Sequence, residues 1–418
     1  MHGLRRWWDD TAGGLPATFW YLWSGLLINR AGAFAMLFLS LYLTAARGAS
    51  ASLAGAVVGA YGAGGAVGTL LGGVLADRWG RRATLLAAHL GAAGLMVGLA
   101  FSRDLLVIAA LAALVGVVHS MPSPAFVAAI VDVVPEDRRA RAFNLQFWAF
   151  NLGMALASLL AGVLAEASFL ALFLVDAGTT LAAAAVIALK VPETLDPRTR
   201  ISVLPAGRRP GLHTALTDRV FLVFVGLTFL LAVLTMQTST IMPLAMRADG
   251  LRPSAYGLVV ALGGALIVAG QLFVPRLIAP YRKATVLSVS TGLMALGFGA
   301  LAVADHLPFY LAAAVVWTGG QMLAAPPNAQ INADLAPPEL RARYQSVFYL
   351  TFPAASFVAP ALGGLSLEYL GERHWLVVGG LGLVAAAGHL LAGPARERRV
   401  AALRSAVASR EKALAGDR

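Results

Sequence analysis

Long apolar segments recur along the chain, and short polar segments separate them. Most of the apolar runs exceed the roughly 18 residues that a helix needs to cross a bilayer. The pattern predicts an even number of spanning helices, twelve in all, with both chain ends on one side of the membrane. The expected spans are 17–45, 51–76, 83–101, 105–133, 140–164, 168–189, 219–246, 254–279, 284–303, 308–335, 341–369 and 374–393.

Composition supports this pattern. The chain has 418 residues, of which 59% are hydrophobic and 13% charged, whereas a soluble domain carries about 25% charged residues. It contains no cysteine, which excludes disulfides and thiolate metal sites. It also lacks a P-loop and a His-Glu-x-x-His motif. We therefore expect no metal, no cofactor and no enzymatic activity.

The positive charges lie mostly on one side of the predicted topology. The net charge is +11, which in a soluble protein would suggest nucleic acid. Of the 32 Lys and Arg residues, 26 fall in the segments on the side of the termini and five in the opposite loops, while Arg30 lies inside a span. Basic loops mark the cytoplasmic side. We expect a cell-membrane protein with cytoplasmic termini and no nucleic-acid partner.

The chain divides into two similar halves. The long polar segment 191–218 falls between the sixth and seventh spans and is expected to be a cytoplasmic loop. It separates a six-helix bundle over 1–190 from a second bundle over 219–395, which a cytoplasmic tail over 396–418 follows. "PAFVAAIVDVVPEDRRAR" before the fifth span matches "PPNAQINADLAPPELRAR" before the eleventh at a constant offset of 202 residues. Such parallel repeats occur in secondary transporters, whose halves rock about a central site.

The turn "GGVLADRWGRR", Gly72 to Arg82, concentrates charge between two apolar spans. Its arginines either enforce topology or form contacts with neighbouring helix ends. This turn resembles the loop 2–3 signature of the major facilitator superfamily, and the repeated segments resemble that family's loop 4–5 and 10–11 signatures. The resemblance implies an all-α membrane protein with twelve transmembrane helices in two six-helix pseudo-repeats.

The resemblance also implies a cytoplasmic latch that closes in the outward-open state. Asp77 would contact the start of span eleven, and Arg81 and Asp132 would belong to one charge cluster. The corresponding loop after span eight, "APYRKATVL", is degenerate, so the latch is expected on one side only. The latch candidates are Gly73, Asp77, Arg78, Gly80, Arg81, Arg82, Asp132, Arg139, Arg141, Asp334, Arg341 and Arg343.

Within the family, the chain is most similar to drug:proton antiporters. The resemblance implies proton-coupled efflux of lipophilic small molecules by alternating access, by a monomer whose partners are the substrate, protons and the bilayer. Two alternatives stay open. One is uptake or exchange of a small metabolite, for which Arg30 would suit an anionic group, and the other is a non-transporting receptor on the same fold.

Ionisable residues at membrane depth are costly and usually functional. Arg30 and Asp176 each lie about 18 Å from the cytoplasmic surface by helical rise. Arg30 forms a structural pair with Asp176 or with backbone and neighbouring polar groups, or Asp176 carries protons with Arg30 taking part in the coupling, or Arg30 anchors an anionic substrate. His119 in span four either couples protons or makes a helix–helix hydrogen bond.

Polar and aromatic residues on spans one, seven and ten are candidates for a substrate cavity, because these spans line the cavity in the family. Ordinary helix packing is the alternative for each of them. The candidates are Asn29, Arg30, Phe34, Phe38, Gln237, Trp317, Gln321 and Asn328.

Overall fold

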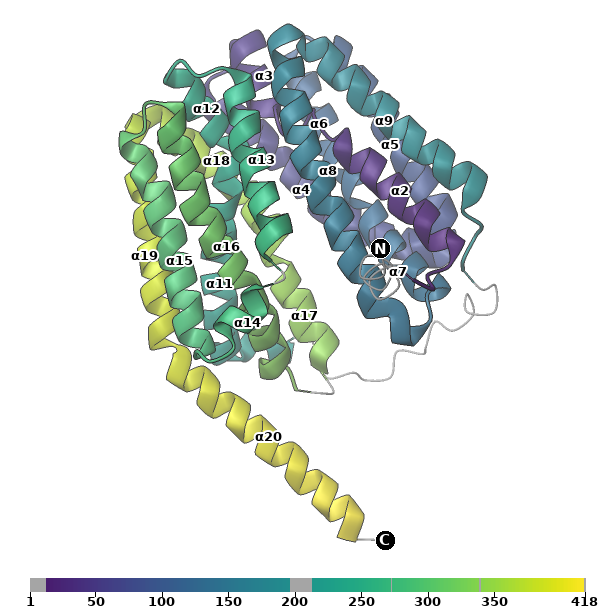
Figure 1. The fold of residues 1–418 in the computed structure, drawn as a ribbon, viewed down its shortest axis with the longest axis vertical. Coiled ribbons are helices and arrows are strands. Elements are labelled where there is room, and N and C mark those ends of the chain that lie inside the picture. The colour runs from purple at the N-terminus through teal and green to yellow at the C-terminus, as the bar shows by residue number, and fades with distance from the viewer. Residues whose placement is uncertain (1–12, 196–212, 272, 338–339, 417–418) are drawn as a thin grey trace, which may run out of the picture.

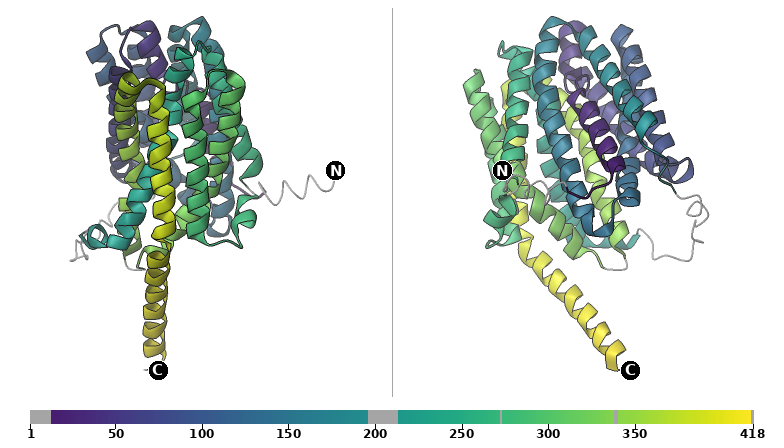
Figure 2. Two further views of the ribbon diagram at one scale, coloured as in Figure 1. Left: turned by 90° about the vertical axis from the view of Figure 1, so that its left-hand side faces the viewer. Right: turned by 45° about the vertical axis from the view of Figure 1, so that its right-hand side comes forward.

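The computed structural model describes residues 13–195, 213–271, 273–337 and 340–416, and in these ranges the chain forms helices and turns without a strand. Two bundles lie side by side, the first in purple to blue and the second in teal to yellow (Figures 1 and 2). A last helix projects from the second bundle. This is the predicted fold class.

The first bundle contains the six spans of the N-terminal half, with spans one and four each divided in two. Its helices are α2 (Ala17–Ala31), α3 (Leu39–Ala46), α4 (Ala51–Arg78), α5 (Arg81–Phe101), α6 (Leu105–Ser120), α7 (Pro122–Val133), α8 (Arg139–Ala167) and α9 (Phe169–Lys190).

The second bundle repeats this order after the short helix α10 (His213–Thr217). Its helices are α11 (Arg219–Thr240), α12 (Met242–Ala248), α13 (Pro253–Gly270), α14 (Val274–Ile278), α15 (Lys283–Ala300), α16 (Leu307–Leu335), α17 (Arg341–Tyr349), α18 (Thr351–Leu370) and α19 (His374–Leu391), followed by the tail helix α20 (Gly393–Gly416).

All twelve predicted spans correspond to helices. Ten described stretches are long and apolar enough to cross a membrane, and one of these, 347–391, contains both α18 and α19. The remaining span is the first, which the length criterion misses because it consists of α2 and α3, with 15 and 8 residues. The sequence pattern placed this span correctly but did not reveal its interruption at 32–38.

The bundle has two faces with different contents. We call the face near the chain ends the terminal face, and it carries 79–80, 134–138, 191–195, 279–282 and the start of α20. We call the opposite one the distal face, and it carries 47–50, 102–104, 249–252 and 371–373. The charge pattern predicts that the terminal face is cytoplasmic.

The halves pack closely near the distal face. A Cβ on Gly55 of α4 would meet the carbonyl oxygen of Pro360 on α18, and a Cβ on Gly257 of α13 would meet that of Ser158 on α8. These two contacts are related by the same 202-residue offset as the sequence repeat. Small residues let membrane helices approach in this way.

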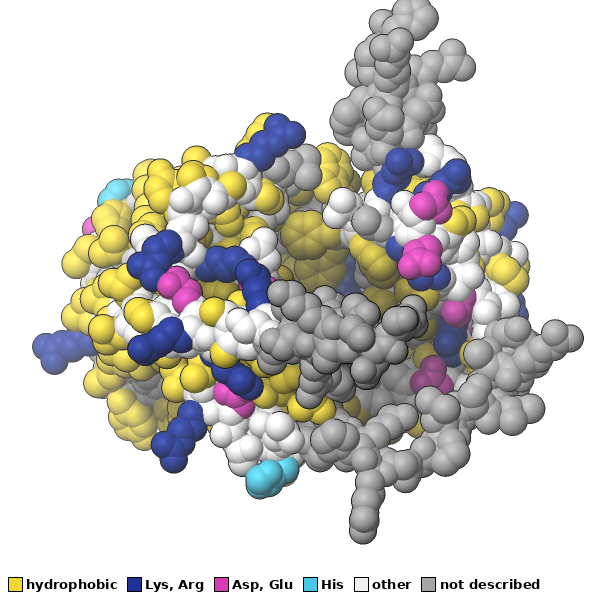
Figure 3. Space-filling model, turned by 90° about the horizontal axis from the view of Figure 1, so that it is seen from below, with side chains coloured by type: hydrophobic (Ala, Val, Ile, Leu, Met, Phe, Trp, Pro, Cys, Tyr) yellow, Lys and Arg dark blue, Asp and Glu magenta, His cyan; other side chains and the backbone are white. Residues whose placement is uncertain are grey.

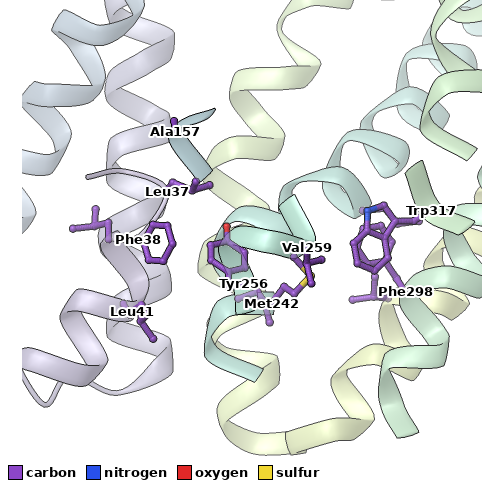
Figure 4. Packing of buried hydrophobic residues seen from close by; sticks show 14 of the residues in the cluster. Leu37, Phe38, Leu41, Ala157, Met242, Tyr256, Val259, Phe298 and Trp317 are labelled. Atoms are coloured by element: carbon purple, nitrogen blue, oxygen red, sulfur yellow. The ribbon is translucent and has the colours of Figure 1, made fainter. Parts of the chain in front are cut away.

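One hydrophobic core crosses between the halves. Phe38 packs edge-on against Tyr256, with ring centroids 5.2 Å apart (Figure 4). Toward the terminal face α4 packs instead within its own half, where Gly68 and Gly72 meet the carbonyls of Val117 and Met121. A separate core over α2, α4, α5 and α7 supports that end of the first bundle. The described contacts between halves therefore concentrate at the distal face.

Candidate functional site

The interruption of span one places polar groups at membrane depth. The chain leaves the helix after Ala31 and resumes it at Leu39. Gly32 lies so close to Thr179 of α9 that a Cβ there would collide with the threonine side chain. Backbone amides outside a helix need partners in an apolar environment, so this segment requires a nearby acceptor.

Asp176 of α9 supplies that acceptor. Its side chain is 1% exposed, and Oδ2 accepts a hydrogen bond from the Ala35 amide at 3.0 Å. Thr180 donates to Oδ1 at 3.5 Å, and Asn29 donates to the Thr180 hydroxyl at 3.1 Å. Asn29, a predicted cavity residue, thus supports Asp176 indirectly.

Of the alternatives for Arg30, the ion pair with Asp176 is not formed. The Arg30 guanidinium lies over the Phe150 ring, 4.9 Å from its centroid. Among the described residues its Nε is buried without a hydrogen-bond partner, as is His119 Nε2. The Asp176 carboxylate accepts a hydrogen bond from the backbone at Ala35 instead. In the described part of the chain, Arg30 therefore has no carboxylate within ion-pair distance.

Arg30, His119 and Asp176 nevertheless line one cavity of about 190 Å³ between the halves. Thr240 also lines it, 1% exposed and with no described partner for its hydroxyl. Three methionines provide apolar, adaptable surface. The other lining residues are Ala33, Met36, Leu37, Val58, Tyr61, Met154, Met236, Ser239, Ser356 and Pro360.

The remaining predicted cavity residues lie elsewhere. Phe34 and Phe38 belong to the shared core. Trp317 stacks on Phe298 with centroids 5.0 Å apart, and Asn328 accepts a hydrogen bond from Thr228 at 3.0 Å. These four therefore pack helices together.

Gln237 and Gln321 are not among the residues that line the cavity either. Gln237 is 3% exposed, and its Oε1 has no described partner. The sequence did not lead us to predict the methionines, Tyr61 and Thr240 as cavity residues. Nothing in a single sequence distinguishes a side chain that faces a cavity from one that packs in the core.

On the terminal face, Arg81 lies at the centre of a group of charged residues. Its side chain is 13% exposed and forms ion pairs of 3.1 Å with both Asp77 and Asp132. It also donates to the Ala76 carbonyl at 2.7 Å. Arg81 and Asp132 thus belong to one charge cluster, as expected.

Glu193 extends this cluster and was not predicted. Its Oε1 accepts from the Arg81 amide at 2.8 Å, at the amino end of α5. Burial alone raises the pKa of Glu193, but hydrogen bonds from backbone amides, including those of Leu195 and Arg81, outweigh it and lower the pKa. Gly80, with φ of +114°, permits this approach, because a Cβ there would overlap the carboxylate.

Three other latch candidates of the first half donate hydrogen bonds to backbone carbonyls of the same half. Arg82 donates to the Ala188 carbonyl at 2.6 Å, and Arg139 to the Val131 carbonyl at 3.0 Å. Arg141 donates to the Gly13 carbonyl at 2.9 Å.

Arg78 and Gly73 show no close packing. The Arg78 side chain is exposed, and a Cβ on Gly73 would meet open space.

The second half retains part of the cluster despite its divergent loop. Lys283 pairs with Asp334 at 2.7 Å. The two residues stand 202 positions after Arg81 and Asp132, the pair of the first half. Arg404 of α20 also binds Asp334, at 3.3 Å. The second half therefore keeps an equivalent ion pair, which the sequence did not lead us to expect.

The expected contact of Asp77 with the start of span eleven falls on a segment of which little is described. The side chains of Arg341 and Arg343 lie outside the described residues, and the ion-pair partner of Asp77 is Arg81 of its own turn. Viewed from this face, Lys and Arg side chains lie on the two parts of the molecule that flank a depression with hydrophobic side chains inside it (Figure 3).

A family comparison decides the class of this protein. The family model of the Major Facilitator Superfamily matches residues 22–281 and 229–415. The chain belongs to the major facilitator superfamily. Such a membership, with the fold and the cavity between halves, makes the protein a membrane transporter and not an enzyme.

Individual relatives agree with this membership. The chain is 28% identical to the uncharacterized MFS-type transporter YttB of Bacillus subtilis, over 86% of this chain and 90% of the relative. It is 24% identical to a Na(+), Li(+), K(+)/H(+) antiporter of Planococcus maritimus, over 70% and 76%. It is 25% identical to the multidrug resistance protein MdtH of Aeromonas hydrophila, over 75% and 79%.

A solved structure shares the fold. A peptide transporter POT, crystallised with sulfate, superimposes with a TM-score of 0.76 at 18% identity, over 94% of this chain and 99% of that one.

Proposed function

We propose that this transporter exports lipophilic small molecules in exchange for protons, by rocking residues 1–190 against 219–395. The cavity that contains Arg30, His119 and Asp176 carries the proposal, because residues of both halves line it. A site shared by two halves changes its access when they move relative to each other. The methionines in its wall suit apolar cargo of varied shape.

Asp176 is the proposed proton carrier. Carboxyl groups at membrane depth that border a cavity commonly take part in proton relays. Its contact with Ala35 connects the state of the carboxyl group to the interruption of span one, which also lines the cavity. The antiporter and MdtH relatives are consistent with proton-coupled export. We further propose a monomer in the cell membrane with both termini in the cytoplasm.

The test uses everted membrane vesicles that are acidified inside. A lipophilic compound that dissipates the pH gradient only when this protein is present is the expected result. Asp176→Asn should abolish this response at an equal protein level. His119→Gln tests whether His119, the other candidate for proton coupling, takes part. Asp104→Asn is the matched control, because Asp104 caps α6 on the distal face, away from the cavity. No response to any lipophilic compound would contradict proton-coupled export.

A second candidate is transport of a small acidic molecule. The observation that favours it is Arg30, whose buried Nε has no described partner. An anionic group entering the cavity would supply one. Arg30→Gln should then abolish uptake of small radiolabelled carboxylates while the response to neutral lipophilic compounds persists. Equal loss of both activities would argue against an anion anchor.

A further inference from the structure

We propose that two carboxylate clasps, Glu166 with Ser254 and Glu368 with Ser52, hold the distal face shut and open once in each transport cycle. Each clasp joins one half of the protein to the other. The proposal rests on the alternating-access function proposed above, and it assigns to that function a gate on the face opposite the terminal latch.

The first clasp links α8 to α13. Glu166 lies at the end of α8, and Ser254 lies in the first turn of α13. Oε1 of Glu166 accepts a hydrogen bond from the Ser254 amide at 3.2 Å and another from the Ser254 hydroxyl. A carboxylate at a helix amino terminus satisfies free amides and interacts favourably with the helix dipole.

The second clasp links α18 to α4. Glu368 lies near the end of α18, and its Oε2 accepts from the Ser52 amide at 2.8 Å, in the first turn of α4. The Ser52 side chain approaches Ser50, whose hydroxyl accepts from the Leu53 amide. The geometry therefore repeats the first clasp with the halves exchanged.

The two clasps are copies of each other. Glu368 stands 202 residues after Glu166, and Ser254 stands 202 residues after Ser52. Both residue types recur at the offset of the internal repeat, and in both copies the carboxylate reaches across to the other half. Asp104 differs, because it caps α6 within its own half by accepting from the Leu106 and Val107 amides.

The clasps lie next to close backbone contacts between the halves. Gly55 and Gly257, each within one turn of a clasp serine, are the residues that touch Pro360 and Ser158. Glu166 and Glu368 are themselves exposed to solvent, so each clasp contributes modestly. A gate that must open in every cycle requires contacts of this kind, which favour one state without locking it.

Labelling of a buried residue tests the gate. The chain contains no cysteine, so a single Met246→Cys is the reporter. Met246 is 1% exposed and lines a cavity between the halves near the distal face. A membrane-impermeant maleimide added from that face should label it slowly in the parent. Glu166→Ala and Glu368→Ala should each raise the rate about two- to fivefold, as expected for loss of a helix cap.

Controls separate a gate from general loosening. The double variant should label faster than either single variant, and the Glu→Gln changes should act less, because an amide oxygen still accepts a hydrogen bond. Asp104→Ala should leave the rate unchanged. A double variant that labels at the parent rate would overturn the proposal, and so would an equal increase in Asp104→Ala.

The readout is independent of cargo. The labelling rate reports opening of the distal face without any substrate. Faster labelling in the clasp variants, together with no transported compound in the vesicle assay, would support the gate and contradict proton-coupled export. Transport of a compound in the vesicle assay, together with unchanged labelling of the clasp variants, would support proton-coupled export and contradict the gate.

Discussion

Removing the side chain of Asp176 should release the interrupted segment of span one. In Asp176→Ala, the Ala35 amide loses its acceptor while it remains buried. An unsatisfied buried donor costs about 2 kcal/mol, which is a roughly 30-fold change in a local equilibrium. Asp176→Asn keeps an oxygen that can accept the bond, so its cost should be about half as large, since neutral hydrogen bonds are about half as strong as charge-assisted ones.

Hydrogen–deuterium exchange measures this effect directly. Amides in 32–38 of Asp176→Ala should exchange about 30-fold faster than in the parent, since local opening sets the exchange rate. Asp104→Ala should accelerate exchange only at the start of α6, where Asp104 is the cap. Parent-like exchange in 32–38 of Asp176→Ala would refute an anchoring role for this carboxylate.

Three further predictions concern the latch and the interface. Arg81→Ala loses two ion pairs and a carbonyl contact and should lower the free energy of unfolding in detergent by about 1–2 kcal/mol, whereas exposed Arg78→Ala should change it little. The pKa of Glu193 is lowered in the folded protein, so its contribution to the free energy of unfolding is complete above the ordinary pKa of about 4.3 and declines as pH falls through the folded pKa. In Glu193→Gln, the free energy of unfolding measured across this acid range should lack that decline. Gly257→Leu would strike an α8 carbonyl and should expose the Met246→Cys reporter to maleimide, while Gly226→Leu, with open space at its Cβ, should not.

The two faces of the protein use carboxylates differently. On the terminal face, Asp77 and Asp132 of the first half and Glu193, just after α9, gather around Arg81. On the distal face, Glu166 and Glu368 reach between halves. In the described contacts, the distal carboxylates therefore link the two halves, whereas the terminal carboxylates bind an arginine of the N-terminal half.

Much of the fold was predictable from the chain alone. Twelve apolar runs, the offset of 202 residues and the asymmetry of basic loops follow from local requirements: lipid demands helices of sufficient length, and each half must bury similar surfaces. The charged turn around Arg81 was predictable as well, because its residues lie close together in sequence or repeat at a constant spacing.

The partners of the buried polar groups were not predictable in this way. Depth along a helix placed Arg30 and Asp176 at one level. Because of helix rotation and the interruption at 32–38, however, Asp176 accepts a hydrogen bond from the Ala35 amide and does not pair with Arg30. The clasps, the cavity methionines and the Lys283–Asp334 pair likewise join segments far apart in sequence. Composition and periodicity fix which residues enter the membrane, whereas the choice of partners depends on how packed helices are rotated and crossed, because only that geometry decides which side chains meet.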